Sequence, residues 1–163
     1  MTNVPDVCVA VSTADCVPVL LYAPDRKVVA AVHAGWRGTV LHIARKAASL
    51  MIEAYDCDPT QLVAGIGPSI SQAAFEVGEE VVKSFSNRRA SQWSGFFDVM
   101  RRRKSAYRSM GNQPFTIVRG RIALRAYRDR WHLYLYRYED YFSARRLSVK
   151  SGRILTGICL KKS

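Results

Sequence analysis

The chain carries the apolar run Cys16-Val17-Pro18-Val19-Leu20-Leu21-Tyr22 and, five residues later, a second run, Val28-Val29-Ala30-Ala31-Val32-His33. Both runs are short and rich in β-branched or aliphatic residues, the pattern of buried strands. Pro18 stands near the start of the first run, where a missing backbone donor is tolerated. The linker contains Pro24-Asp25, which has the composition of a tight turn. We therefore predict an antiparallel hairpin of two strands.

Further strands and helices are predicted on both sides of this hairpin. Short apolar runs predict strands, and apolar residues at helical spacing predict amphipathic helices. The predicted strands are Val7–Val11 and Leu62–Ile66, and the predicted helices are Leu41–Tyr55 and Glu76–Phe85. Thr39 stands where it could cap the first helix, which should end near Asp56 because Asp58-Pro59 follows. The pattern belongs to the α/β or α+β class.

Length and composition fit one domain. The chain has 163 residues, of which 48% are apolar and 23% charged, so collagen-like repeats and wholesale disorder are excluded. No run of the sequence approaches the ~20 apolar residues of a membrane span, and the first residues lack the pattern of a secretory signal. The four cysteines form no CxxC pair. A cytoplasmic protein with no membrane partner is expected.

The basic charge of the chain is confined to its last third. The formal net charge is +12, yet residues 1–100 hold 8 Lys+Arg and 10 Asp+Glu, whereas residues 101–163 hold 17 and 3. Residues 101–137 alone carry 11 Lys+Arg, with tyrosines and tryptophan interleaved. Such a segment suits phosphate contact and base stacking. One hypothesis is therefore a nucleic-acid-binding protein that uses residues 101–137.

Cys16 and His33 stand at the same end of the predicted hairpin, one at the mouth of each strand. A thiolate and an imidazole are good ligands for zinc or copper. They are equally suited to act as nucleophile and base of a metal-free thiol enzyme. The alternative is that Cys16 is a small buried apolar residue and His33 a strand-end residue without a catalytic role.

Other candidates carry weaker signals. Arg37, between two glycines, could hold an anion bidentately, or it could be a solvated turn charge. His42 is expected on a helix, as a surface or packing residue. The remaining cysteines are expected to be structural or incidental: Cys8, Cys57 and Cys159.

Four blocks of the sequence resemble the laccase-domain polyphenol oxidase family. They are Thr13–Leu21 (TADCVPVLL), Val29–Gly38 (VAAVHAGWRG), Ile66–Ile70 (IGPSI) and Phe75–Gly78 (FEVG). The resemblance implies a layered α/β/β/α sandwich of mixed sheets, in the α+β class. Many members are purine nucleoside phosphorylases with adenosine deaminase activity. A purine nucleoside and orthophosphate are thus the implied substrates, and copper-dependent polyphenol oxidation is the alternative.

The resemblance also implies a site. In the family, two histidines and one cysteine hold zinc or copper, and by motif Cys16 and His33 match two of these ligands. Arg37 would be a third catalytic residue. The resemblance places the turn with Gly67 and Ser69 near the pocket. Arg145 and Arg146 are further candidates for contact with the phosphate.

Two departures from the family pattern generate expectations. The family's other histidine comes from a Val-His-Gly-type segment upstream of the TADC block, and this sequence has none. We expect residues 1–163 to be a single laccase-like domain that is truncated at its N-terminus and binds metal weakly. The second departure is residues 99–137, an anomalous basic segment in place of a family block.

That segment can be explained by compensating frameshifts. Residues 125–135, RAYRDRWHLYL, can be encoded so that the reading frame one base later gives GHIEIDGICT, which restores the family's Gly-Ile-Cys-Thr motif. We therefore expect residues 99–137 to be foreign to the fold, and nucleic acid to be a partner only if the segment is genuine.

Overall fold

The computed structural model describes residues 1–70, 74–86, 115–118, 123–127, 141–148 and 150–162. The strands are β1 (Cys8–Thr13), β2 (Val17–Ala23), β3 (Val28–Ala34), β4 (Val63–Ile66), β5 (Phe115–Val118), β6 (Ala123–Tyr127) and β7 (Ile154–Cys159). The helices are α1 (Trp36–Val40), α2 (Ile43–Tyr55), α3 (Glu79–Ser86) and α5 (Ala144–Leu147). The chain divides into two compact units, Met1–Ile70 with Pro114–Ser163, and Ser71–Gln113.

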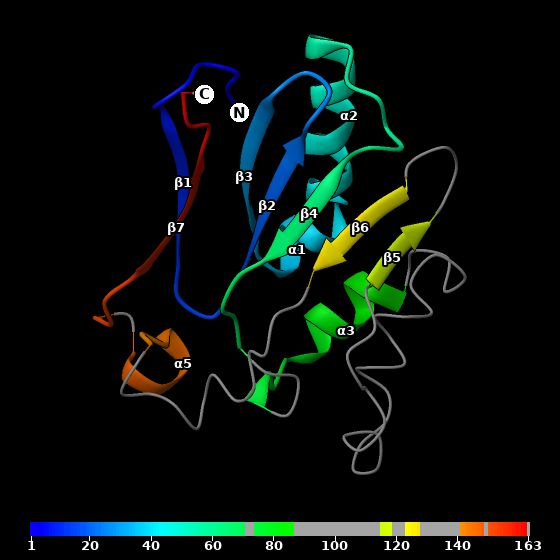
Figure 1. Ribbon diagram of the computed structural model, residues 1–163. Coiled ribbons are helices and arrows are strands. Elements are labelled where there is room, and N and C mark those ends of the chain that lie inside the picture. Colours follow the sequence, from blue (N-terminus) through cyan, green and yellow to red (C-terminus); the bar gives the residue numbers. More distant parts are fainter. Residues whose placement is uncertain (71–73, 87–114, 119–122, 128–140, 149, 163) are drawn as a thin grey trace. The chain divides into compact units, whose positions relative to one another are not determined.

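The first unit contains two sheets (Figure 1). Five strands form one sheet in the order β3-β2-β4-β6-β5, and β1 pairs with β7 in the other. The predicted hairpin is confirmed, since β2 and β3 pair antiparallel from Val17↔Ala34 to Ala23↔Val28. The larger sheet is mixed because β4 and β6 run parallel. The α+β class predicted from the sequence is therefore confirmed.

One face of the β2–β3 hairpin forms the hydrophobic core with α2. Alternate residues of a strand point to one face, and in β2 and β3 these are Val17, Val19, Leu21, Ala23, Val28, Ala30, Val32 and Ala34. They pack with Ala48 and Met51 of α2, both fully buried. Cys57, the residue that follows the C-cap of α2, is also buried in this core.

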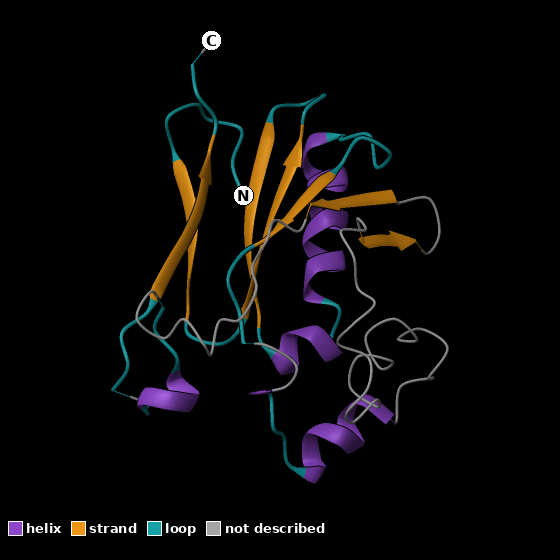
Figure 2. Ribbon diagram, turned by 60° about the horizontal axis from the view of Figure 1, so that its bottom comes forward, coloured by secondary structure: helices purple, strands orange, loops and turns teal. Residues whose placement is uncertain are grey.

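The opposite face of the hairpin turns toward the smaller sheet. Val29 is 1% exposed and forms a bridge with Thr2 of the N-terminal segment. Figure 2 shows β1 and β7 side by side on one side of β3 and β2, with α2 on the other side. Helix, larger sheet and smaller sheet thus form three successive layers within this unit. Pro18 and His33, which pair in the register, share the face toward the smaller sheet.

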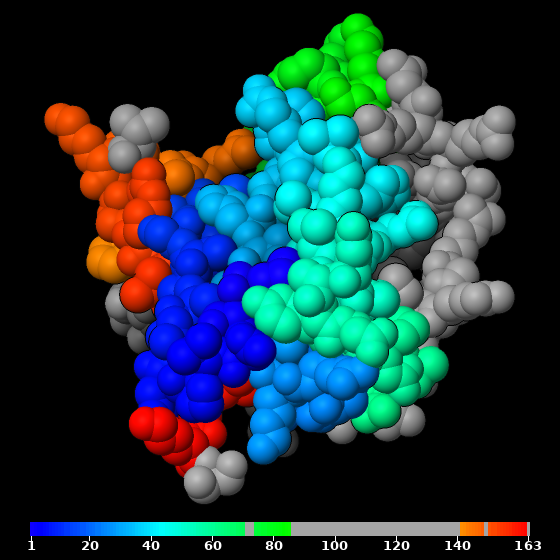
Figure 3. Space-filling model, turned by 90° about the horizontal axis from the view of Figure 1, so that it is seen from above, coloured from blue at the N-terminus to red at the C-terminus, as the bar shows by residue number. Residues whose placement is uncertain are grey.

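The two ends of the chain lie together at one edge of this unit. The backbone N–H of Asp6 donates to the carbonyl of Leu160 at 2.8 Å, and Lys162 forms an ion pair with the Asp6 carboxylate at 3.6 Å. Figure 3 shows the N-terminal residues in dark blue against the C-terminal residues in red.

The helical segment after β3 differs from the prediction in one respect. It breaks into α1 and α2, and Thr39 lies inside α1, so the prediction that Thr39 caps the longer helix is wrong. His42 occupies the N-cap position of α2 with a left-handed φ of 56°. Leu41, between the two helices, is consequently 46% exposed. The predicted end of the helix is confirmed by Asp56 at the C-cap.

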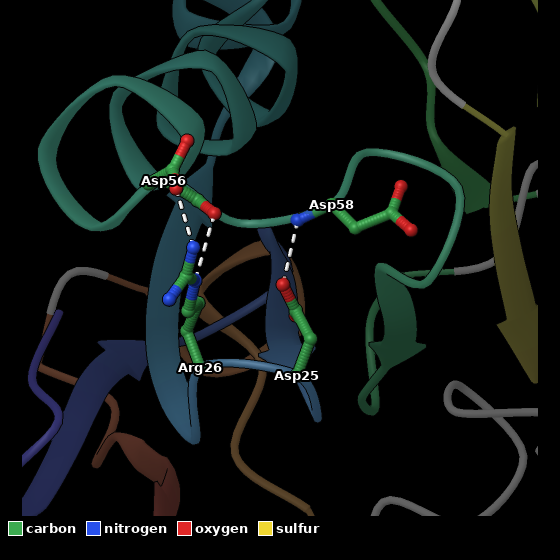
Figure 4. Close-up of polar contacts among 4 residues, drawn as sticks. All are labelled: Asp25, Arg26, Asp56 and Asp58. Atoms are coloured by element: carbon green, nitrogen blue, oxygen red, sulfur yellow. Dashed lines mark hydrogen bonds and ion pairs between the residues drawn. The ribbon is translucent and has the colours of Figure 1, made fainter.

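A polar cluster ties the hairpin turn to the segment that follows α2 (Figure 4). Arg26 forms an ion pair with Asp56 and also donates to its backbone carbonyl at 3.0 Å. The backbone N–H of Asp58 donates to the carboxylate of Asp25 at 2.7 Å. These contacts fix where α2 stops relative to the hairpin.

The second unit, residues 71–113, contains α3, which confirms the helix predicted over Glu76–Phe85 with a later start. Val81 and Phe85, four residues apart, are both buried. Most of residues 99–137 lies outside the described residues. None of the helices in the described ranges is long and apolar enough to cross a membrane.

The core contribution of α2 can be measured with two neighbouring residues. Met51 is 0% exposed and Leu50 is 52% exposed on the same helix. Met51→Ala should lower the free energy of unfolding by about 2–5 kcal/mol because it leaves a cavity against the sheet. Leu50→Ala, the matched control, should change it by less than about 1 kcal/mol. Urea denaturation of both variants tests this, and equal losses would contradict the assigned core face.

Candidate functional site

The hairpin register brings Cys16 and His33 to one end of the larger sheet. His33 pairs with Pro18, and Val17 pairs with Ala34, so Cys16, directly before β2, stands opposite Gly35. Antiparallel partners share a face, and so do residues two apart in a strand. Cys16 and His33 are therefore diagonal neighbours on the face toward the smaller sheet. The register brings the two residues to the same end of the sheet, and their convergence on one ligand stays a prediction.

Gly35 leaves room for the sulfur of Cys16. A Cβ at Gly35 would lie 3.2 Å from Cys16 Sγ, closer than ordinary van der Waals contact. Burial raises the pKa of the Cys16 thiol above its ordinary value, and the negative charge of Asp15 raises it further. Cys16 is thus held mainly as a thiol when no cation neutralises it, which disfavours a free thiolate nucleophile. His33, by contrast, is exposed.

Asp15 joins three segments of the chain around Cys16. Its carboxylate accepts hydrogen bonds from the hydroxyl of Ser143 at 2.6 Å and from the backbone N–H of Arg145 at 2.7 Å. Its backbone carbonyl accepts a hydrogen bond from the N–H of Ile70 at 3.0 Å. Asp15 has a φ of 82°, a left-handed conformation that is uncommon outside glycine. The surrounding hydrogen bonds hold this conformation in place.

Gly67 packs between the two sheets near the same end. Its N–H donates to the carbonyl of Pro18 at 3.0 Å. A Cβ at this position would lie 2.8 Å from Pro18 Cγ and 3.2 Å from Thr156 Cγ2 of β7. Glycine is therefore required for close packing. These contacts give Gly67 a packing role, and its place near the substrate, which the resemblance implies, stays a prediction.

The arginines predicted as anion contacts lie on two different elements. Arg37 belongs to α1, and its guanidinium stacks over the ring of Trp36 at 4.3 Å from the centroid. Arg145 and Arg146 belong to α5, which Ser143 caps by accepting a hydrogen bond from the Arg146 N–H at 3.3 Å. Asp15 is the residue directly before Cys16, and its carboxylate thus contacts the α5 backbone.

The donor chemistry of Cys16 and His33 fits a zinc or copper ion. Thiolate sulfur and imidazole nitrogen are ligands that both metals accept. In the described part of the chain, however, no three His, Cys, Asp or Glu side chains form a group that could hold a metal ion. Catalytic zinc sites use three protein ligands. Cys16 and His33 could therefore supply only part of such a donor set.

The sequence pattern missed Asp15, Ser143 and Thr156 as members of this region. Asp15 lies in the TADC block, but its partner Ser143 is 128 residues away, so local spacing gave no signal for the pair. Ser143 had the weaker signal of a helix-capping residue before Ala144-Arg145-Arg146. Ser69 lies between Gly67 and Ile70, on the turn that the Asp15 carbonyl holds.

Gly67 and Gly65 provide a matched test of the packing between the sheets. Gly67→Ala should lower the free energy of unfolding by about 1–3 kcal/mol, since the added methyl meets Pro18 and Thr156. At Gly65 no atom lies within 4 Å of an added Cβ, so Gly65→Ala should be neutral or stabilise by up to about 1 kcal/mol. Thermal or urea unfolding distinguishes the two variants. A tolerated Gly67→Ala would show that β7 does not pack on this turn.

Asp15→Asn should change both the stability and the reactivity of Cys16. The amide presents a donor toward Ser143 or Arg145, which should cost about 1–2 kcal/mol of unfolding free energy. Removing the charge lowers the pKa of Cys16, so the pH midpoint for its alkylation by iodoacetamide should fall. Peptide mass spectrometry of the metal-free chain at a series of pH values gives that midpoint.

Asp56→Asn is the matched control, because Asp56 is also an aspartate at positive φ, and its carboxylate forms an exposed ion pair with Arg26. It should leave the Cys16 midpoint unchanged and cost less than about 0.5 kcal/mol, as an exposed pair does. An unchanged Cys16 midpoint in Asp15→Asn would contradict the electrostatic coupling.

Comparison with known proteins supports one family over nearly the whole chain. A purine nucleoside phosphorylase of Bacteroides thetaiotaomicron is 38% identical over 172 residues, covering 99% of this chain and 60% of that protein. Adenosine deaminase RL5, from an unknown prokaryotic organism, is 33% identical over 171 residues, with 99% of this chain and 61% of that protein covered. The chain thus spans about three fifths of the length of these relatives.

Solved structures agree with the sequence relatives. The crystal structure of the Bacillus licheniformis hypothetical protein YfiH matches with a TM-score of 0.69 and 26% identity, over 98% of this chain and 60% of that chain. A Neisseria meningitidis protein matches with a TM-score of 0.70 and 26% identity, over 98% of this chain and 63% of that chain. The family model described as multi-copper polyphenol oxidoreductase laccase matches residues 1–161, and the chain belongs to that family.

Proposed function

We propose that this chain carries part of the active site of a metal-dependent enzyme that acts on purine nucleosides. The observation that supports the proposal is the placement of Cys16 and His33 as diagonal neighbours at one end of the larger sheet. Relatives with the names purine nucleoside phosphorylase and adenosine deaminase supply the substrate class.

Cys16 and His33 are the residues that would hold zinc, or copper as the alternative. A bound ion of this kind supplies Lewis-acid polarisation of a water or phosphate oxygen. The cation would also offset the burial and the Asp15 charge that keep Cys16 protonated. Asp15 positions this loop through its bonds to Ser143 and Arg145.

Two reactions fit this substrate class. In phosphorolysis, an orthophosphate oxygen attacks the ribose C1′ and the purine leaves with the electrons of the glycosidic bond. In deamination, water adds at C6 of adenosine and ammonia leaves. Arg37, Arg145 and Arg146 are the proposed phosphate contacts, since guanidinium groups bind phosphate bidentately. Gly67 and Ser69 belong to the turn that we place beside the substrate.

The test is product analysis by chromatography with purified chain, an excess of zinc, and adenosine or inosine with and without phosphate. We expect free base and ribose 1-phosphate only when phosphate is present. With adenosine and no phosphate, we expect inosine and ammonia. Cys16→Ser and His33→Ala should each reduce bound zinc per chain and lower the rate by at least about 10-fold, the smallest loss expected near a metal ligand.

Cys8→Ser is the matched control because Cys8 lies on β1, in the exposed face of the other sheet. It should retain wild-type zinc content and rate. A chain that binds zinc and leaves both nucleosides unchanged would contradict the proposal. Oxidation of a phenol by the copper-loaded chain, without nucleoside turnover, would favour the polyphenol oxidase alternative that the family description suggests.

A further inference from the structure

Two cysteines outside the candidate site stand directly opposite each other. Cys8 is the first residue of β1 and Cys159 is the last residue of β7, and the antiparallel register pairs them. Both are free and exposed. Residues paired in an antiparallel ladder point to the same face, so the two thiols lie on the exposed face of the smaller sheet. β1 begins and β7 ends close to the two ends of the chain (Figure 1).

The backbone geometry of this pairing accommodates a disulfide. Opposed residues in an antiparallel ladder have Cα atoms about 4.5 or 5.5 Å apart, depending on the hydrogen-bonding pattern. Disulfides span Cα separations of about 4.4–6.8 Å. Either pattern is therefore within reach, and the strands need no large movement.

The sulfur of Cys8 already reaches across toward β7. A Cβ at Gly157, two residues before Cys159 on the same face, would lie only 2.9 Å from Cys8 Sγ. Cys8 also donates a weak hydrogen bond to the Val9 carbonyl at 3.9 Å. Rotation about χ1 of Cys8 would redirect this sulfur along β7 toward Cys159. Gly157, which has no side chain, leaves that path open.

We propose that Cys8 and Cys159 form a reversible disulfide that is a redox modification site of this protein. With a low-molecular-weight disulfide such as oxidised glutathione as oxidant, one thiolate attacks a glutathione sulfur and releases one glutathione thiolate. The second cysteine thiolate then attacks the mixed disulfide at the protein sulfur and releases the second glutathione. The protein loses two protons and two electrons, and the oxidant takes them up to give two thiols.

The disulfide would link β1 covalently to β7, the strand pair that supports the candidate site. β1 leads into Asp15 and Cys16, and Thr156 of β7 packs against Gly67. The disulfide would close a loop of about 150 residues between Cys8 and Cys159. Closure of so long a loop constrains the unfolded chain strongly. The oxidised form should therefore melt at a higher temperature than the reduced form.

The experiment incubates the whole metal-free chain, folded, with oxidised glutathione, and then alkylates the remaining thiols with iodoacetamide in denaturant. Intact mass and tryptic peptides are measured without reductant. We expect two alkylated cysteines instead of four, a Cys8–Cys159 linked peptide, and a melting temperature about 5–10 °C above that of the reduced chain. Dithiothreitol should reverse all three changes.

Cys8→Ser and Cys159→Ser are the matched variants, each on an exposed position. Each should keep a glutathione adduct on the remaining cysteine, because the resolving thiol is absent. Four alkylated cysteines in the wild type, stable glutathione adducts on both residues, a linkage to Cys16, or a disulfide between two chains would each overturn the proposal. The Cys16→Ser variant should still form the Cys8–Cys159 bond, which separates this site from the candidate metal site.

Discussion

The antiparallel register of β2 with β3 determines both the core and the candidate site. Pairing of Val17 with Ala34 and of Ala23 with Val28 directs every second residue of the hairpin onto α2. The same alternation directs Pro18 and His33 to the other face. Because side chains in strands alternate with a period of two, a slip of one residue would place His33 in the core and apolar residues toward the smaller sheet. Packing of α2 therefore enforces the position of His33.

Asp15 carries the second constraint, which acts between segments distant in the sequence. Its carboxylate and carbonyl accept hydrogen bonds from Ser143, Arg145 and Ile70. Hydrogen bonds to a charged acceptor are stronger than neutral ones, and together they offset the left-handed φ of this residue. The negative charge that binds α5 also disfavours the thiolate of Cys16. The Asp15 side chain thus both binds the α5 backbone and raises the pKa of the neighbouring Cys16 thiol.

Local patterns in the sequence predicted the hairpin, β1, β4 and the end of α2, because strand runs, turn residues and a following proline act over a few residues. The same patterns led to the wrong cap at Thr39, since nothing local marks His42 in a left-handed conformation as the start of α2. The pairing of Cys8 with Cys159 and of Asp15 with Ser143 joins residues more than 120 positions apart. Such contacts depend on the assembled layers and leave no periodic signal. The placement of Cys16 and His33 at one end of the sheet was predictable because a short turn fixes their register. Their metal-binding role comes from resemblance and stays a prediction. The foreign origin of residues 99–137 also stays a prediction.

The pairing of β1 with β7 has a consequence for synthesis of the protein. β1 leaves the ribosome about 150 residues before its partner β7, a delay on the order of ten seconds at typical elongation rates. During that interval the unpaired backbone groups of β1 form an exposed edge, which can pair with strands of other nascent chains. The hairpin and α2, whose contacts are local, can fold in the meantime. Binding of β1 by a chaperone, or its pairing with a strand of another chain, would therefore affect the fraction of newly made chains that reach the native state.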